Sequence, residues 1–153
     1  MNKQVYNQAL RERRLVKFPE GPKLVKKEIG AALTDLKTAK ESWRKKDNKW
    51  TTIQGYYAIF HAARALIYSR KIKEKTHYHL VVAVKVLFAD EYLLNKKFVF
   101  ELQEAMGLRE KADYESEYSS KDAKYVLDIA GDFIKEVKEL LKLKVLRVWR
   151  ERM

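Results

Sequence analysis

The chain has 153 residues, enough for one domain with its own hydrophobic core. It contains no cysteine, which excludes disulfides, thiol nucleophiles and thiolate-bound metals. Only five glycines and two prolines accompany 46% hydrophobic residues, a composition that favours helices. The net charge of +12 is concentrated at the ends: residues 1–27 carry +6 and residues 140–153 carry +4. These ends could bind a polyanion such as RNA, pair with acidic faces of a partner subunit, or remain solvated extensions.

No segment is long and apolar enough to span a membrane. The longest stretch without a charged residue covers residues 50–63, and a spanning helix needs about 20 apolar residues. Met1 is followed by polar residues and by no apolar segment typical of a signal peptide. We therefore expect a soluble, cytoplasmic protein with no membrane partner.

The first half of the chain predicts an arm followed by two long helices. Residues 1–22 are interpreted as a basic, partly ordered arm that ends in a break rich in proline and glycine. Apolar residues at spacings of three and four predict a helix over 23–46 and a second over 49–70. Gly55 lies inside the second helix, where we expect it to permit the close approach of another helix. Residues 71–79 are predicted to be a basic loop.

The second half predicts three further helices. The run 80–88 is apolar and β-branched and could form a strand, but we find no sheet partner for it in the sequence. We therefore predict a short buried helix there and no sheet. Helices over 95–114 and 120–141 complete an all-α, up-and-down bundle of four to five helices. The bundle covers residues 23–141, and residues 142–153 are a basic extension of the last helix.

Polar side chains interrupt the core-facing lines of two helices. In the helix over 95–114, Arg109 and Asp113 continue the row of apolar residues on one face of the helix. Because buried charge is costly unless paired, either Asp113 pairs internally with Arg64 or Arg109, or an anionic ligand binds. On the second helix, the polar face consists of Tyr57, His61, Arg64 and Tyr68.

The three histidines do not indicate a metal site or a cofactor. His61 lies among apolar residues, which favours a structural role with Tyr114 or Asp113 as its partner. His77 and His79 lie in a loop with too few neighbouring ligands to hold a metal. No glycine-rich phosphate loop is present, which excludes nucleotide hydrolysis by that route.

Three segments carry a family resemblance. The sequence GYYAIFHAARAL at 55–66 resembles the YYAxFHAARALL signature of HEPN-domain proteins, small helical proteins of archaea and bacteria. The Lys-Thr-His step at 75–77 and the RxxADY segment at 109–114 are similar to further segments of that family. The resemblance covers about residues 24–141. It implies a helical bundle that commonly forms homodimers, with its polar residues near the dimer cleft.

The resemblance also implies a set of activities. Many HEPN proteins are metal-independent endoribonucleases, and several are toxins paired with a small nucleotidyltransferase antitoxin. Their motif is an Arg that can steady the scissile phosphate and, after four to six residues, a His that can move protons. No His follows Arg109 at that spacing, and Tyr114 stands there instead. A tyrosine hydroxyl, with an ordinary pKa of about 10, is a poor base at neutral pH.

We therefore interpret the chain as a homodimeric RNA- or nucleotide-binding protein. It would be one half of a toxin–antitoxin-like pair with a nucleotidyltransferase. One alternative is an active endoribonuclease in which Arg109 works with His61, His77 or Tyr114, and another is a non-catalytic dimeric interaction module. We predict that one polar cluster contains His61, Arg64, Arg109, Asp113 and Tyr114. The proposed binding residues are Tyr57, Arg64, His77 and Asp113.

Overall fold

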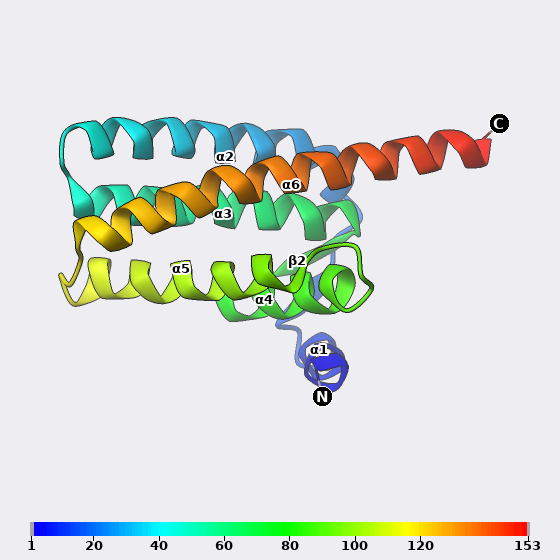
Figure 1. Ribbon diagram of the computed structural model, residues 1–153. Coiled ribbons are helices and arrows are strands. Elements are labelled where there is room, and N and C mark those ends of the chain that lie inside the picture. Colours follow the sequence, from blue (N-terminus) through cyan, green and yellow to red (C-terminus); the bar gives the residue numbers. More distant parts are fainter. Residues whose placement is uncertain (1, 153) are drawn as a thin grey trace.

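The computed structural model describes the backbone of residues 2–152 and the side chains of residues 2–142. Four long helices run alternately up and down: α2 (Gly21–Arg44), α3 (Asn48–Ser69), α5 (Lys96–Tyr114) and α6 (Ser120–Arg152) (Figure 1). α3 lies at the centre and packs against the other three. The predicted all-α, up-and-down bundle is therefore confirmed.

The central position of α3 follows from its sequence. Fifteen of its 22 residues are buried, including residues on every side of the helix, because neighbouring helices cover it. Asp47 is the N-cap of the helix, and its Oδ1 accepts a hydrogen bond from the Trp50 backbone N–H at 3.1 Å. A Cβ at Gly55 would lie 2.9 Å from Cγ1 of Val126, so this glycine lets α3 and α6 approach closely, as predicted.

The prediction that the chain has no sheet is wrong. Strands β1 (Leu15–Lys17) and β2 (Ile72–Glu74) pair antiparallel, in the two segments expected to be a partly ordered arm and a loop. Each strand has three residues, too few to show the two-residue periodicity of a sheet. The arm is also more structured than predicted, since it begins with α1 (Asn2–Arg11).

Residues 80–88 are helical, as predicted. They belong to α4 (His77–Val84) and to the following π-helical turn η1 (Lys85–Ala89). Thr76 is the N-cap of α4, and its side chain accepts a hydrogen bond from the backbone N–H of His79 at 3.1 Å. The partition of the chain into an arm, a bundle and an extension remains a prediction.

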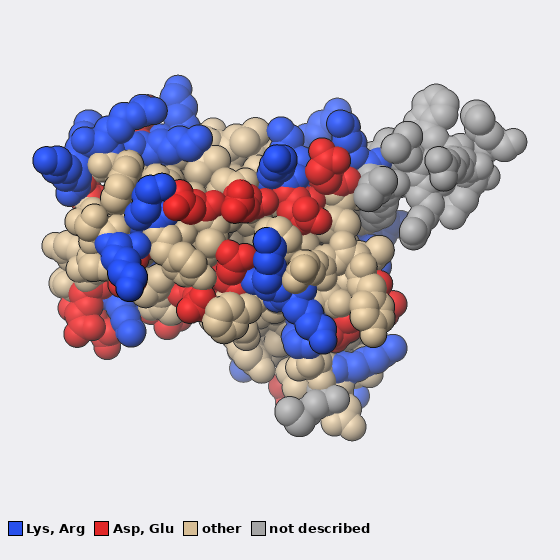
Figure 2. All heavy atoms as spheres, in the orientation of Figure 1, with Lys and Arg blue, Asp and Glu red and all other residues tan. Residues whose placement is uncertain are grey.

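On the face of the molecule drawn in Figure 2, positive and negative side chains are partly separated. Figure 2 shows Lys and Arg over α2 and along the upper edge of α6, whereas Asp and Glu form a row along α6 and toward α5. The backbone of α6 continues past the end of the bundle (Figure 1). The side chains of the predicted basic extension, from residue 143 onward, lie outside the described residues. Among the helices of the described chain, none has the length and apolar character needed to cross a membrane.

Candidate functional site

Arg109 of α5 reaches the central helix and forms the core of the candidate site. Its Nη2 donates a hydrogen bond to the Tyr57 hydroxyl at 2.8 Å and lies 3.2 Å from Oδ2 of Asp113. Only 11% of the Arg109 side chain is exposed. Its Nε is buried and has no hydrogen-bond partner among the described residues. Of the two internal partners considered for Asp113, the structure shows Arg109, within the same helix, and part of the guanidinium remains without a partner among the described residues.

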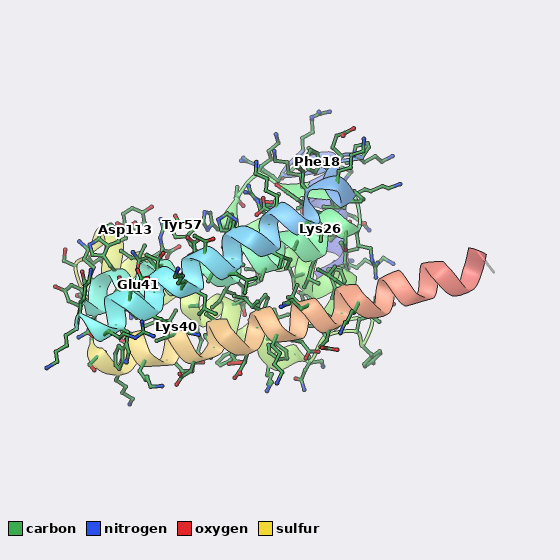
Figure 3. All side chains as sticks on the ribbon, turned by 90° about the horizontal axis from the view of Figure 1, so that it is seen from above. Phe18, Lys26, Lys40, Glu41, Tyr57 and Asp113 are labelled. Atoms are coloured by element: carbon green, nitrogen blue, oxygen red, sulfur yellow. The ribbon has the colours of Figure 1, made fainter. Side chains whose placement is uncertain are left out.

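Three tyrosine rings surround this guanidinium. Its Cζ lies 5.2 Å from the ring centroids of Tyr57 and Tyr114 and 5.9 Å from that of Tyr56, all within cation–π range. Tyr57 and Asp113 lie side by side in Figure 3, on the same side of the bundle. Tyr114 is 72% exposed, so the site has an aromatic surface open to solvent. We call Arg109, its three tyrosines and Asp113 the arginine–tyrosine site.

His77 adjoins the arginine–tyrosine site through Tyr56. The Tyr56 hydroxyl lies 2.5 Å from Nδ1 of His77, and the imidazole stacks on Phe60 with ring centroids 4.7 Å apart. Burial lowers the pKa of His77 below its ordinary 6.5, and the Arg109 charge lowers it further. The imidazole is therefore neutral at neutral pH.

The Tyr56 hydroxyl engages one of the two ring nitrogens of His77. Burial raises the pKa of Tyr56 well above its ordinary value, so this hydroxyl keeps its proton. This hydroxyl and Nδ1 of His77 share one hydrogen bond: Tyr56 donates when the ring proton lies on Nε2 and accepts when it lies on Nδ1. Nε2 is therefore a hydrogen-bond donor in the first tautomer and a free acceptor in the second.

A second group, which we call the charged network, occupies the other part of the polar face of α3. Nδ1 of His61 lies 2.6 Å from Oε2 of Glu28, and its Nε2 lies 3.6 Å from Oδ2 of Asp35. Arg64 donates from Nε to both Glu74 oxygens at 3.0 and 3.2 Å. The raised pKa of Asp35 reflects its partial burial, which the nearby His61 opposes.

The prediction that His61 pairs with Tyr114 or Asp113 is wrong, because Glu28 of α2 occupies that role. Sequence reasoning missed both Glu28 and Glu74. Glu28 falls within the apolar stripe that includes Val25 and Ala32, and this position was a usable signal. Glu74 follows from no helical pattern, because it lies on the short strand β2.

The five residues predicted to form one cluster are distributed over two groups. Arg109, Asp113 and Tyr114 belong to the arginine–tyrosine site, whereas His61 and Arg64 belong to the charged network. The Phe60 ring lies between the groups, with centroids 5.5 Å from the His61 ring and 4.7 Å from the His77 ring. No hydrogen bond or ion pair between described residues joins the two groups.

Metal binding finds no support in this geometry. Among the described side chains, no group of three or more His, Cys, Asp or Glu is placed to hold a metal ion. The arginine–tyrosine site instead offers one cation, aromatic faces and polar hydrogens, which suit a phosphate or a base.

The fold and the polar face of α3 define a small helical-bundle protein with a buried, tyrosine-enclosed arginine. The family model of the HEPN domain matches residues 25–140, and the chain belongs to the HEPN domain family. It is also similar to a protein named "Putative toxin MJ0605" of Methanocaldococcus jannaschii. The two are 27% identical over 115 residues, which cover 74% of this chain and 86% of that relative.

Proposed function

We propose that this chain is a toxin-like HEPN protein that binds single-stranded RNA or a nucleotide at the arginine–tyrosine site. The observation that carries the proposal is the Arg109 guanidinium, enclosed by tyrosine rings, with its Nε unpartnered among the described residues. Arginine is suited to bidentate contacts with phosphate oxygens. The exposed Tyr114 ring offers a face on which a base can stack.

Binding of fluorescent single-stranded RNA and of a labelled adenine nucleotide, followed by anisotropy, tests this proposal. Arg109→Ala should weaken binding of both by at least about tenfold, as expected for loss of a charge-assisted contact. Arg70→Ala is a matched control, because Arg70 also stacks on a ring, that of Phe88, with its Cζ 4.8 Å from the centroid. It lies 13 residues after Tyr57, about 20 Å along the helix. Unchanged binding by the Arg109 variant would refute the proposed site.

A second candidate function is metal-independent RNA cleavage. It is favoured by His77, which contacts Tyr56 and Tyr57, the same rings that contact Arg109. Against it, Nδ1 of His77 is engaged by the Tyr56 hydroxyl, which leaves Nε2 as the one ring nitrogen available for proton transfer. Cleavage of single-stranded RNA in the presence of EDTA, lost in both Arg109→Ala and His77→Ala, would establish the enzyme. Binding without cleavage would favour the first proposal.

The proposal includes two partners: a second copy of the chain and a nucleotidyltransferase that acts as its antitoxin. Support comes from the family and from a relative that is named as a putative toxin. Light scattering at micromolar concentration tests the dimer, and a monomer mass would refute it. Co-purification with a nucleotidyltransferase encoded next to this chain tests the pair.

The basic ends are proposed to supply most of the affinity for RNA. Residues 1–27 and 140–153 together hold +10 of the net charge of +12. Binding that neutralises phosphates falls with salt, with a log–log slope of roughly −0.7 per contact on single strands. Removal of residues 142–153 should therefore weaken binding and flatten the slope while the dimer survives. If truncation dissociates the dimer and leaves RNA binding unchanged, the extension is an assembly element instead.

A further inference from the structure

A groove runs between α2 and α6 on the side of the bundle away from α5. Seen from above, the two helices lie close together near Lys40 and diverge toward the end of α2 that carries Lys26 (Figure 3). Two hollows lie along this line, and they share Lys138 and Glu139 in their walls. The two hollows therefore adjoin, and together we call them the groove.

The floor of the groove is apolar and only partly covered. α2 contributes side chains over positions 25–36, which span 11 steps and about 16 Å of helix, or three turns. Leu33 is 42% exposed, which is unusual for a leucine at the centre of such a line. The apolar side chains of the floor are Val25, Ile29, Leu33, Leu36, Ile134 and Leu141.

The rim of the groove is positively charged. All of its four lysines are exposed, and Glu139 is the single carboxylate that lines the described groove with them. None of these lysines has a carboxylate oxygen within 4.0 Å in the part of the chain that the structure describes. The rim lysines are Lys26, Lys135, Lys138 and Lys142. Their charge is therefore available to a partner.

We propose that this lysine-rimmed groove binds an amphipathic helix of a partner protein, with an apolar stripe flanked by acidic residues. An apolar stripe fits the floor, and flanking carboxylates would face the rim lysines on both sides. A helix of three turns matches the length of the floor. The proposal is independent of RNA binding at Arg109.

Three other occupants fit the groove less well. A second copy packing through the same face would bring one lysine rim against another, and like charges repel. The last residues of this chain are themselves basic, with +4 over 140–153. RNA would find cations but no ring among the residues that line the described groove, and single-stranded bases bind mainly by stacking on rings.

The test uses a synthetic three-heptad helical peptide with leucine at the a and d positions, glutamate beside them and a fluorescent label. Full-length protein should bind it more tightly than a matched peptide with lysine in place of glutamate. Leu33→Asp should weaken binding at least about tenfold, and it should fold because this side chain is already half exposed. The double variant Lys138→Glu and Lys142→Glu should reverse the preference between the two peptides. Lys121→Glu, in the first turn of α6 and outside the groove, is the matched control and should bind as the unmodified protein does.

Amide chemical shifts in the protein locate the bound peptide. Shifts confined to positions 25–36 and 131–142 support the proposal, and an absence of shifts there overturns it. Equal affinity for both peptides also overturns it. If Leu33→Asp converts a dimer into a monomer, the groove is an interface between copies of this chain. If the lysine variants abolish RNA binding and no variant affects the peptide, the groove is an RNA surface. Either of these results would refute the proposal.

Discussion

Arg109 and Tyr57 join α5 to the central helix across 52 residues of sequence, through a hydrogen bond of 2.8 Å from Nη2 to the phenol oxygen. Both groups belong to the candidate site, so the packing of the bundle and the geometry of the site depend on the same contact. Tyr57 also contacts Tyr56 and His77 through its ring. A change at this phenol therefore tests whether the site and the fold are coupled.

Tyr57→Phe should lower the free energy of unfolding by about 1–3 kcal/mol, because one part-buried N–H of Arg109 Nη2 loses its acceptor and only the contact with Asp113 remains. Urea denaturation followed by circular dichroism measures the loss. Tyr125→Phe is the matched control: it removes a hydrogen bond to Glu104 that is exposed, so the loss should stay below about 1 kcal/mol. Equal losses in the two variants would contradict a special role for the Arg109 contact.

Gly55→Ala should destabilise the bundle, whereas Gly30→Ala should stabilise it. Both glycines lie inside long helices, where alanine is intrinsically better by about 1 kcal/mol. A Cβ at position 55 would lie 2.9 Å from Cγ1 of Val126, a buried β-branched side chain with little freedom to move. The overpacking should outweigh the intrinsic gain and leave a net loss of about 1–2 kcal/mol. At position 30 the new Cβ meets no atom within 4 Å. Thermal unfolding of the two variants checks the opposite signs, and a stabilising Gly55→Ala would contradict the close approach of α3 and α6.

The sequence was sufficient for the long helices because each repeats its apolar residues over several turns. The apolar stripe of α2 has a clear helical period, whereas α3 is a long run of residues buried on nearly every side, and both features indicated helices in this chain order. Arg109 with Asp113 was also predictable, since a pair four residues apart is local in a helix.

Contacts between segments that are distant in sequence were harder to predict. The partner of His61 is Glu28, 33 residues earlier, and nothing in the spacing of either residue specifies the relative rotation of two helices. The β1–β2 pair joins residues that lie more than fifty positions apart in two short segments. Because His61 pairs with Glu28 and Asp35 of α2, whereas Arg109 pairs with Asp113 within α5, the single predicted cluster became two groups.

Arg64→Met should strongly destabilise the protein. Glu74 shows only 4% of its side chain to solvent, and its partner Arg64 lies 2.9 Å from Oε2 through Nη2. Removal of the arginine leaves a buried carboxylate unpaired, which costs about 3–5 kcal/mol. The double variant Arg64→Met and Glu74→Leu should recover most of that loss, because the buried carboxylate is then removed together with its partner. Chemical denaturation gives the free energy of unfolding of the unmodified protein, the single variant and the double variant. The exposed pair Lys124–Asp128 is the control, and Lys124→Met should cost less than about 1 kcal/mol.

The stability of the protein should depend on pH through His77. Its folded pKa lies below the ordinary 6.5, mainly because of burial and further because of the Arg109 charge. Between the folded pKa and about 6.5 the unfolded chain therefore binds a proton that the folded chain does not, and stability rises with pH across that interval. The contribution of His77 is complete above pH 6.5 and decreases as the pH falls toward the folded pKa. His79 also has a lowered pKa, so the comparison must isolate one histidine. The free energy of unfolding of the unmodified protein and of His77→Gln, measured from pH 7.5 to pH 4, gives that difference. As the pH falls through this interval, the free energy of unfolding of the unmodified protein should decrease relative to that of His77→Gln. A difference between the two proteins that does not depend on pH would show that His77 titrates as it does in the unfolded chain.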